Sequence, residues 1–263
     1  MSHPLDVPAD VRLMQLLTQW LLGVLALILL WALLNWLARL PQFAIAGVTV
    51  RGDVAHNNAL TLRANVVPRL SGNFFTVDLA QARTLFESVP WVRSANVQRV
   101  FPNRLRVTLE EHQAVALWGS ENESRLVNSL GEVFEANLGD VEDEALITLA
   151  GPEGSSQAML AMQQRLIAVL APIEARIDTL KLSARGSWRA ELASGADIEL
   201  GRGSEDEVVA RTERFVRTLG QATQRFATAA GPRALLTADL RHEGGYALRL
   251  RGVSTSTSVA APR

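Results

Sequence analysis

An uncharged, strongly apolar segment near the N-terminus constrains this chain most. From Leu13 to Ala38 the sequence reads LMQLLTQWLLGVLALILLWALLNWLA, without a charged residue. This run of about 26 residues exceeds the ~20 that an α-helix needs to cross a ~30 Å hydrocarbon core. Tryptophans, which favour the interfacial zones of a bilayer, stand at Trp20, Trp31 and Trp36. We therefore predict one transmembrane helix over residues 13–40, ended by Arg39 and Pro41.

Two other interpretations of this segment stay open on sequence alone: a cleaved signal peptide and the core helix of a folded domain. Ala44-Ile45-Ala46 resembles a small-residue cleavage site. The first ten residues, MSHPLDVPAD, are however acidic, and the apolar run is too long for a typical signal peptide. Arg12 before the helix and Arg39 and Arg51 after it do not orient it, since long domains translocate largely regardless of such charges.

The composition limits what the rest of the chain can do. Its 263 residues are 48% hydrophobic, which allows one large domain or two modest ones with a real core. A formal net charge of −1 provides no broad basic face to neutralise nucleic-acid phosphates. The absence of cysteine excludes disulfides, thiolate catalysis and cysteine-ligated zinc.

The chain after the apolar segment reads as one strand followed by two helices. FAIAGVTVR, residues 43–51, predicts a strand before a Gly52-Asp53 turn. Residues 57–70 suit a short helix that Pro68 breaks. We expect Asp78 to cap a second helix. The apolar face of that helix would consist of Leu79, Ala82, Leu85 and Phe86.

A β-hairpin follows directly. Pro90 stops the second helix, and residues 89–111 then alternate apolar and polar side chains in two runs joined at Phe101-Pro102-Asn103. Trp91 and the Phe74-Phe75 pair are large aromatics that we expect in a core, with a partner pocket as the alternative for the phenylalanines. The predicted order is strand, helix, helix, strand, strand.

From His112 onward the sequence changes to short strands. We expect them at residues 114–118, 125–128, 132–136, 145–150, 177–184, 187–193 and 196–201. A helix over residues 155–173 interrupts them, and a second follows Ser204, which forms an S-x-x-E capping box with Glu207. The runs 233–240 and 245–251 close the domain on a hairpin, around a core that includes Trp188. The Ser/Thr/Ala-rich tail, residues 252–263, is typical of disorder.

Residues that could carry catalysis or bind a metal do not form a recognisable pattern. The four histidines lack metal-ligand spacing. GRGSED, from Gly201, lacks the third glycine and the lysine of a phosphate-binding loop. Glu110 and Glu111 are adjacent on a strand and so face opposite sides. We predict that the protein is not an enzyme and has no cofactor.

Several motifs, in one order, resemble the FtsQ/DivIB cell-division family, closest to its Gram-negative FtsQ branch. After the membrane helix come GNFFTVDL, VPWVRSANVQRVFPNRLRVTLEEHQAVALW, RLVNSLGEVFE, LKLSARGSWRAEL, IELGR and ADLRHEGG. The resemblance implies an α+β protein with one N-terminal transmembrane helix, a POTRA domain (β-α-α-β-β) at 43–111 and a mainly antiparallel β domain with flanking helices at 112–251. It also implies that residues 1–12 are a cytoplasmic tail, that both domains are periplasmic, and that the protein acts at the division septum in the inner membrane.

The resemblance further implies a partner-binding site at the end of the β domain. Family members bind FtsB, within a complex that also holds FtsL, by pairing an FtsB segment with the last strand of the sheet, which is β-augmentation. The matching residues here are Asp239, Arg241, His242, Tyr246, Leu248 and Leu250. His242 departs from the family pattern, in which an aromatic hydroxyl is common at this position, so individual contacts stay open.

Two functions from different classes are compatible with these observations. One is a divisome scaffold that recruits FtsB and FtsL through the C-terminal edge and meets other division proteins through the POTRA domain and membrane helix. The other is a membrane-anchored, chaperone-like POTRA module that holds unfolded outer-membrane or secreted substrates. A single POTRA unit behind a membrane helix favours the scaffold.

Overall fold

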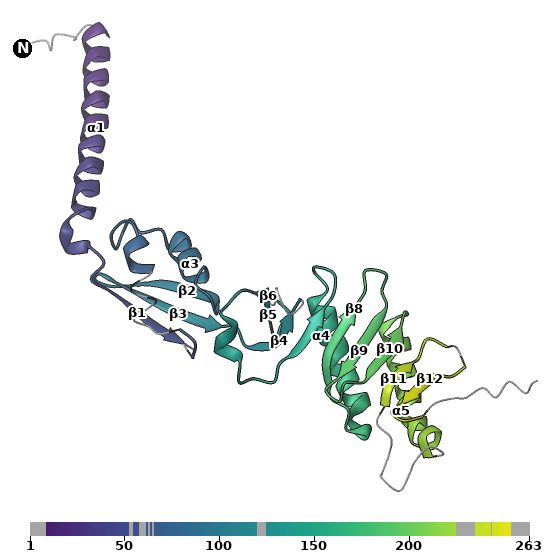
Figure 1. Ribbon diagram of the computed structural model, residues 1–263. Helices are drawn as coiled ribbons and strands as arrows, with labels where there is room; N and C mark the ends of the chain where they lie inside the picture. The colour runs from purple at the N-terminus through teal and green to yellow at the C-terminus, as the bar shows by residue number, and fades with distance from the viewer. Residues whose placement is uncertain are drawn as a thin grey trace, which may run out of the picture. The chain divides into compact units, whose positions relative to one another are not determined.

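The computed structural model contains a long N-terminal helix and two α+β domains (Figure 1). The chain divides into two compact units, Met1–Glu111 and His112–Arg263. The α+β class and the single apolar N-terminal helix are confirmed. The structure describes residues 9–52, 55–57, 62, 64, 66–119, 125–224, 235–242 and 244–253.

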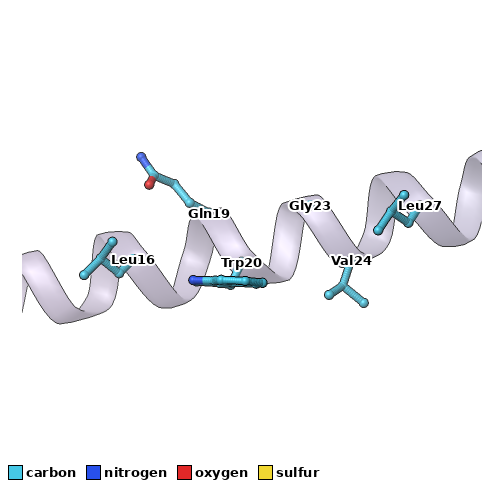
Figure 2. Close-up of a pocket in the computed structure, with 6 residues that line it drawn as sticks. All are labelled: Leu16, Gln19, Trp20, Gly23, Val24 and Leu27. Atoms are coloured by element: carbon cyan, nitrogen blue, oxygen red, sulfur yellow. The ribbon is translucent and has the colours of Figure 1, made fainter.

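Helix α1 (Ala9–Ala38) contains the apolar run. Its segment Leu13–Ala38 is long and apolar enough to cross a membrane, and none of it is buried against the rest of the protein. The core-helix interpretation is therefore wrong, because a core helix buries its apolar side chains. Along one face, Gly23 lacks a side chain and leaves a shallow hollow beside Trp20 (Figure 2).

The first unit builds a three-stranded sheet in the order β1-β3-β2. Strand β3 lies in the centre, parallel to β1 and antiparallel to β2. The predicted hairpin is confirmed. The elements after α1 are η1 (Pro41–Phe43), β1 (Gly47–Gly52), η2 (Val67–Arg69), α3 (Leu79–Glu87), β2 (Val92–Val100) and β3 (Arg104–Glu111).

The first strand begins later than predicted, at Gly47, and includes Gly52. Pro41 starts a 3₁₀ turn in which Phe43 N–H donates to Leu40 O, so residues 41–43 cannot extend. Six of the fourteen residues of the predicted short helix, 57–70, lie outside the described residues; of the others, residues 62, 64 and 66 are helical, and Pro68 lies in the 3₁₀ turn η2.

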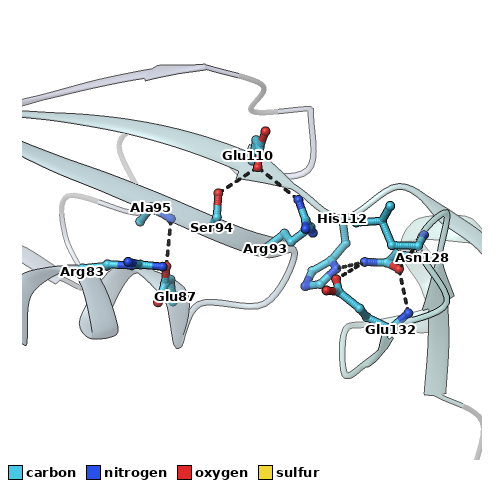
Figure 3. A network of polar contacts seen from close by, with 10 residues as sticks. Arg83, Glu87, Arg93, Ser94, Ala95, Glu110, His112, Asn128 and Glu132 are labelled. Atoms are coloured by element: carbon cyan, nitrogen blue, oxygen red, sulfur yellow. Dashed lines mark hydrogen bonds and ion pairs between the residues drawn. The ribbon is translucent and has the colours of Figure 1, made fainter. Parts of the chain in front are cut away.

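Helix α3 begins as the sequence predicts. The Asp78 carboxylate accepts from the backbone N–H groups of Ala80 and Gln81, at 2.8 and 3.2 Å. Ala82 and Phe86 of the predicted apolar face are fully buried, packed against the sheet. The same helix carries the Arg83–Glu87 pair, whose carboxylate also accepts from the N–H of Ala95 on β2 (Figure 3).

The large aromatics of this unit depart in part from expectation. Trp91 is buried, as predicted, and its ring stacks on the ring of His56, with centroids 3.9 Å apart. Its backbone has a φ of 70°. Phe74 is buried whereas Phe75 is 50% exposed, so the prediction that both are core residues is wrong for Phe75.

The second unit is a nine-stranded mixed sheet in the order β12-β11-β10-β9-β8-β7-β4-β5-β6. Most neighbours are antiparallel; β10–β11, β4–β7 and β7–β8 are parallel. The strands are β4 (Ala114–Trp118), β5 (Arg125–Asn128), β6 (Val133–Phe134), β7 (Ile147–Ala150), β8 (Ile177–Leu182), β9 (Trp188–Leu192), β10 (Asp197–Gly201), β11 (Leu235–Asp239) and β12 (Ala247–Leu250).

Two helices, α4 (Ser156–Leu170) and α5 (Glu205–Gln224), contact each other and the sheet. The alternation of apolar and polar residues along the strands explains the core: on β9, Trp188, Ala190 and Leu192 are buried in it.

The predicted capping box at the start of α5 is confirmed. The backbone N–H of Ser204 donates to the Glu207 carboxylate at 2.8 Å, and the N–H of Glu207 donates to Ser204 Oγ at 3.3 Å. Short 3₁₀ turns occur at η3 (Leu138–Val141) and η4 (Ala171–Ile173).

A buried amide organises the turn between β5 and β6. The Oδ1 atom of Asn128 accepts from the N–H groups of Leu130 and Glu132, and its Nδ2 atom lies 2.6 Å from the Glu132 carboxylate and 2.9 Å from His112 Nδ1 (Figure 3). His112 in turn stacks on Phe134, with ring centroids 4.1 Å apart. These contacts fix the turn that leads into the two-residue strand β6.

Candidate protein-binding edge

The C-terminal hairpin forms one end of the nine-stranded sheet. Strand β12 pairs antiparallel with β11, with Ala238 opposite Leu248 and Asp239 opposite Ala247. Strand β11 in turn lies parallel to β10, which places Asp239 opposite Glu199. In the described part of the chain β12 has no strand on its other side. An edge of this kind presents backbone N–H and C=O groups to which another chain can pair.

The direction of these backbone groups follows from one hydrogen bond. Leu240 N–H donates to Glu199 O at 2.9 Å, so Leu240 and Ala238 direct their backbone groups toward β10. Backbone groups alternate sides along a strand, and therefore Asp239 faces β12 and pairs with Ala247. By the same alternation, the N–H and C=O of Leu248 point to the free side of β12. At Leu248 the edge therefore exposes backbone hydrogen-bonding groups, although the side chain of this residue faces the core.

Three of the predicted site residues face inward. Leu250 is buried, and Leu248 and Tyr246 pack half-buried against the core. The Tyr246 ring meets Phe215 of α5 edge-on, with centroids 5.2 Å apart. The Tyr246 hydroxyl lies 2.8 Å from Oγ1 of Thr218 on the same helix. Tyr246 therefore attaches the start of the edge strand to α5, and Leu248 and Leu250 are held by burial.

The other three span the last residue of β11, Asp239, and the start of the segment that leads to β12, Arg241 and His242. The Asp239 carboxylate accepts from the backbone N–H and the guanidinium of Arg241, at 3.0, 2.9 and 2.6 Å. The side-chain hydrogen bond from Arg241 is the main cause that lowers the pKa of Asp239 to about 2, against the opposing effect of partial burial. His242 is exposed beside this pair. Leu240, between them, is buried.

A polar hollow next to this pair was not predicted. It has a volume of about 560 Å³ and is lined by residues of several neighbouring strands, among them Lys181, Arg189 and Glu199, and by Arg241 beyond the end of β11. Ion pairs join Lys181 to Glu191 and Arg189 to Glu199 across strands. In the sequence, the alternation of charged residues along β8, β9 and β10 indicates that they lie on an exposed face. That these residues meet around one hollow depends on the order of the strands in the sheet.

Within the described residues, no group of three or more His, Cys, Asp or Glu side chains could hold a metal ion.

One apolar helix, a small sheet covered by a helix, and a larger sheet with an open edge define a membrane-anchored POTRA protein with a C-terminal β domain. Residues 43–112 match the POTRA domain, FtsQ-type, and residues 116–241 match the cell division protein FtsQ/DivIB, C-terminal family.

Whole-chain relatives agree with both matches. The chain is 41% identical to the cell division protein FtsQ of Burkholderia pseudomallei, covering 95% of this chain and 97% of that protein. It is 36% identical to the FtsQ of Thiomonas arsenitoxydans, over 95% and 91%, and 34% identical to that of Bordetella pertussis, over 92% of each. The chain belongs to the FtsQ/DivIB cell-division family. Membership and the single N-terminal apolar helix indicate a bitopic membrane protein with a role in the divisome, in a family of scaffolds rather than enzymes.

Proposed function

We propose that this protein is a divisome scaffold that recruits FtsB and FtsL and links them to early division proteins. In this proposal residues 1–12 are cytoplasmic, both folded units are periplasmic, and the protein acts at the septum. The POTRA domain (43–111) and the membrane helix (13–40) meet other division proteins, and the β domain (112–251) binds FtsB.

The open edge of β12 carries this proposal. An FtsB segment would add a strand beside β12, with affinity largely from backbone pairing to groups such as the N–H and C=O of Leu248. Strand β6, at the opposite end of the sheet, has two residues and supports a much shorter pairing. Edge addition therefore fits the C-terminal end of the domain better.

The six predicted site residues take two roles in this mechanism. Tyr246, Leu248 and Leu250 hold the strand against the core, so their side chains position the edge rather than contact FtsB. Asp239, Arg241 and His242 lie where an added strand would extend past β12. The Asp239–Arg241 pair would order the backbone there, and the exposed part of the Arg241 guanidinium is available for a charge-assisted contact.

Two substitutions at one residue test edge addition. Leu248→Ala removes the packed side chain but keeps the N–H, whereas Leu248→Pro removes both. We expect the alanine variant to bind a periplasmic FtsB segment nearly as wild type and the proline variant to lose binding. Circular dichroism and thermal melting of the full chain in detergent must accompany the binding titration.

The outcomes separate backbone pairing from simple unfolding. A folded proline variant with wild-type affinity for FtsB contradicts edge addition. A proline variant that melts no lower than the alanine variant, yet does not bind, supports it. If both variants bind unfolded outer-membrane substrates but the wild type never binds FtsB, the chaperone-like function replaces the scaffold.

A further inference from the structure

Four phenylalanines gather where the first unit meets the membrane helix. We call Phe43, Phe74, Phe75 and Phe101 the aromatic cluster. Phe75 contacts Phe43 and Phe74 edge-on, with ring centroids 4.9 and 5.2 Å apart, and Phe74 lies 6.2 Å from Phe101. Phe75 is 50% exposed and Phe101 is 76% exposed. Two large rings thus remain in solvent although a buried ring lies beside them.

Hydrogen bonds tie this cluster to the end of helix α1. The side-chain amide of Asn73 donates to the carbonyl oxygen of Ala38, the last residue of the helix. The Asn73 Oδ1 atom accepts from the N–H groups of Phe75 and Thr76, both at 3.0 Å. One side chain therefore joins the final turn of the helix to the turn that presents Phe75.

The other two segments of the cluster converge on the same place. The N–H of Phe74 donates to the carbonyl oxygen of Phe43, at 2.8 Å. The N–H of Ala46 donates to the carbonyl oxygen of Asn103, at 2.9 Å, which attaches the tip of the β2–β3 hairpin, where Phe101 lies. Because Phe43 follows the helix end by only five residues, the cluster stays close to that end.

The helix length places this region at a bilayer surface. The segment Leu13–Ala38 would be about 39 Å long as a helix, against a hydrocarbon core of ~30 Å, so its last turn reaches the interfacial zone. That zone is roughly 5–7 Å thick on each side. Arg39 directly follows the helix end and Arg104 begins the strand after the hairpin tip; both are exposed, and their charges suit lipid phosphates. Continuity with the membrane span favours lipid over a protein partner as the occupant.

We propose that Phe75 and Phe101 insert into the headgroup–acyl boundary of the bilayer that α1 crosses. The contact holds the first unit against the membrane surface and limits its rotation about the helix end. It rests on α1 being a membrane anchor and is independent of FtsB binding and of the side on which the units lie.

Depth-dependent quenching tests this contact in the full chain. The sequence has no cysteine, so Phe75→Cys, Phe101→Cys, Leu27→Cys and Ser88→Cys each carry one thiol for a fluorophore. Ser88 is an exposed residue that ends helix α3, four residues before β2, and is the matched control. The nine residues of β2 span about 26 Å to the hairpin tip. Vesicles contain phosphatidylcholine and phosphatidylglycerol with nitroxides at shallow or deep acyl positions.

We expect labels at positions 75 and 101 to be quenched at least about twofold more by shallow than by deep nitroxides, because interfacial groups insert ~5–10 Å. The label at position 27 should show the opposite preference, and the label at position 88 little quenching by either. If position 27 is quenched but positions 75 and 101 behave like position 88, membrane contact is disproved while the anchor stands. Shielding of position 75 only after division proteins are added would assign the cluster to a protein. An unquenched position 27 would overturn both the anchor and this inference.

Discussion

The hydroxyl of Tyr246 lies 2.8 Å from Oγ1 of Thr218, which joins the residue before the edge strand to the helix beneath it. Thr218 already donates to the carbonyl of Arg214 one turn earlier, so its remaining lone pairs can accept from the tyrosine. Together with the Phe215 ring contact, this bond holds the start of β12 against α5. These contacts help to hold the start of the open edge in one position.

Tyr246→Phe should destabilise the second unit by about 0.5–1.5 kcal/mol, the net value of one such hydrogen bond, while the ring stays packed on Phe215. Chemical denaturation measures this loss. In a Thr218→Ala background the same substitution should cost much less, because its partner is already absent. Equal costs in the two backgrounds would contradict the bond.

Asp239 should contribute a stability that disappears in acid. Its pKa is about 2 in the folded protein and 3.8 in an unperturbed carboxyl group, so the folded state favours the carboxylate. This contribution is fully present above pH ~4 and is lost as the pH falls toward 2. Comparing the melting temperatures of wild type and Asp239→Asn at several pH values checks this. The difference should shrink between pH ~4 and ~2, and a difference independent of pH would show that Arg241 does not act through the carboxylate.

Trp91 should matter for folding more than for binding. Trp91→Ala removes a buried ring and its stacking on His56, at an expected cost of ~3–5 kcal/mol. Phe101→Ala is the control, since its ring is 76% exposed and its loss should hardly change the melting temperature. A Trp91→Ala variant that melts normally but loses a partner would reverse this assignment.

The apolar helix should be a retained anchor with the folded units outside the cytoplasm. Reporter fusions at Leu5 and Gly252 would show opposite sides of the membrane, with position 252 periplasmic. A cytoplasmic signal at Gly252, or a mature chain that begins at Gly47, would refute the topology.

Features that depend on neighbouring residues were predictable from the sequence. The anchor rests on one uninterrupted apolar run, the start of α3 on Asp78, and the start of α5 on the Ser204–Glu207 box. Each is decided within one or two helical turns, because a cap or an apolar run acts through groups adjacent in sequence. The hairpin of residues 89–111 belongs with them, since its two runs are joined by a short turn.

The candidate edge was located by family resemblance, and its internal contacts were not foreseeable. Tyr246 and Thr218 are 28 residues apart, and neither position carries a pattern that pairs them. The family resemblance placed Tyr246 among the partner-binding residues, and its side chain packs against Phe215 and Thr218. Asp239 and Arg241 are two residues apart, and their pairing depends on a turn that begins after β11.

The sequence by itself determined the membrane helix, the two α+β segments, most strand positions and the helix caps. Tertiary structure alone decided that β7 lies between β4 and β8, that β12 ends the sheet, and that Phe75 is exposed while Phe74 is buried. The physical reason is that local elements depend on short-range hydrogen bonds and on the period of apolar residues. Strand order and burial depend instead on how distant segments share one core, and many arrangements satisfy the same local pattern until that core is packed.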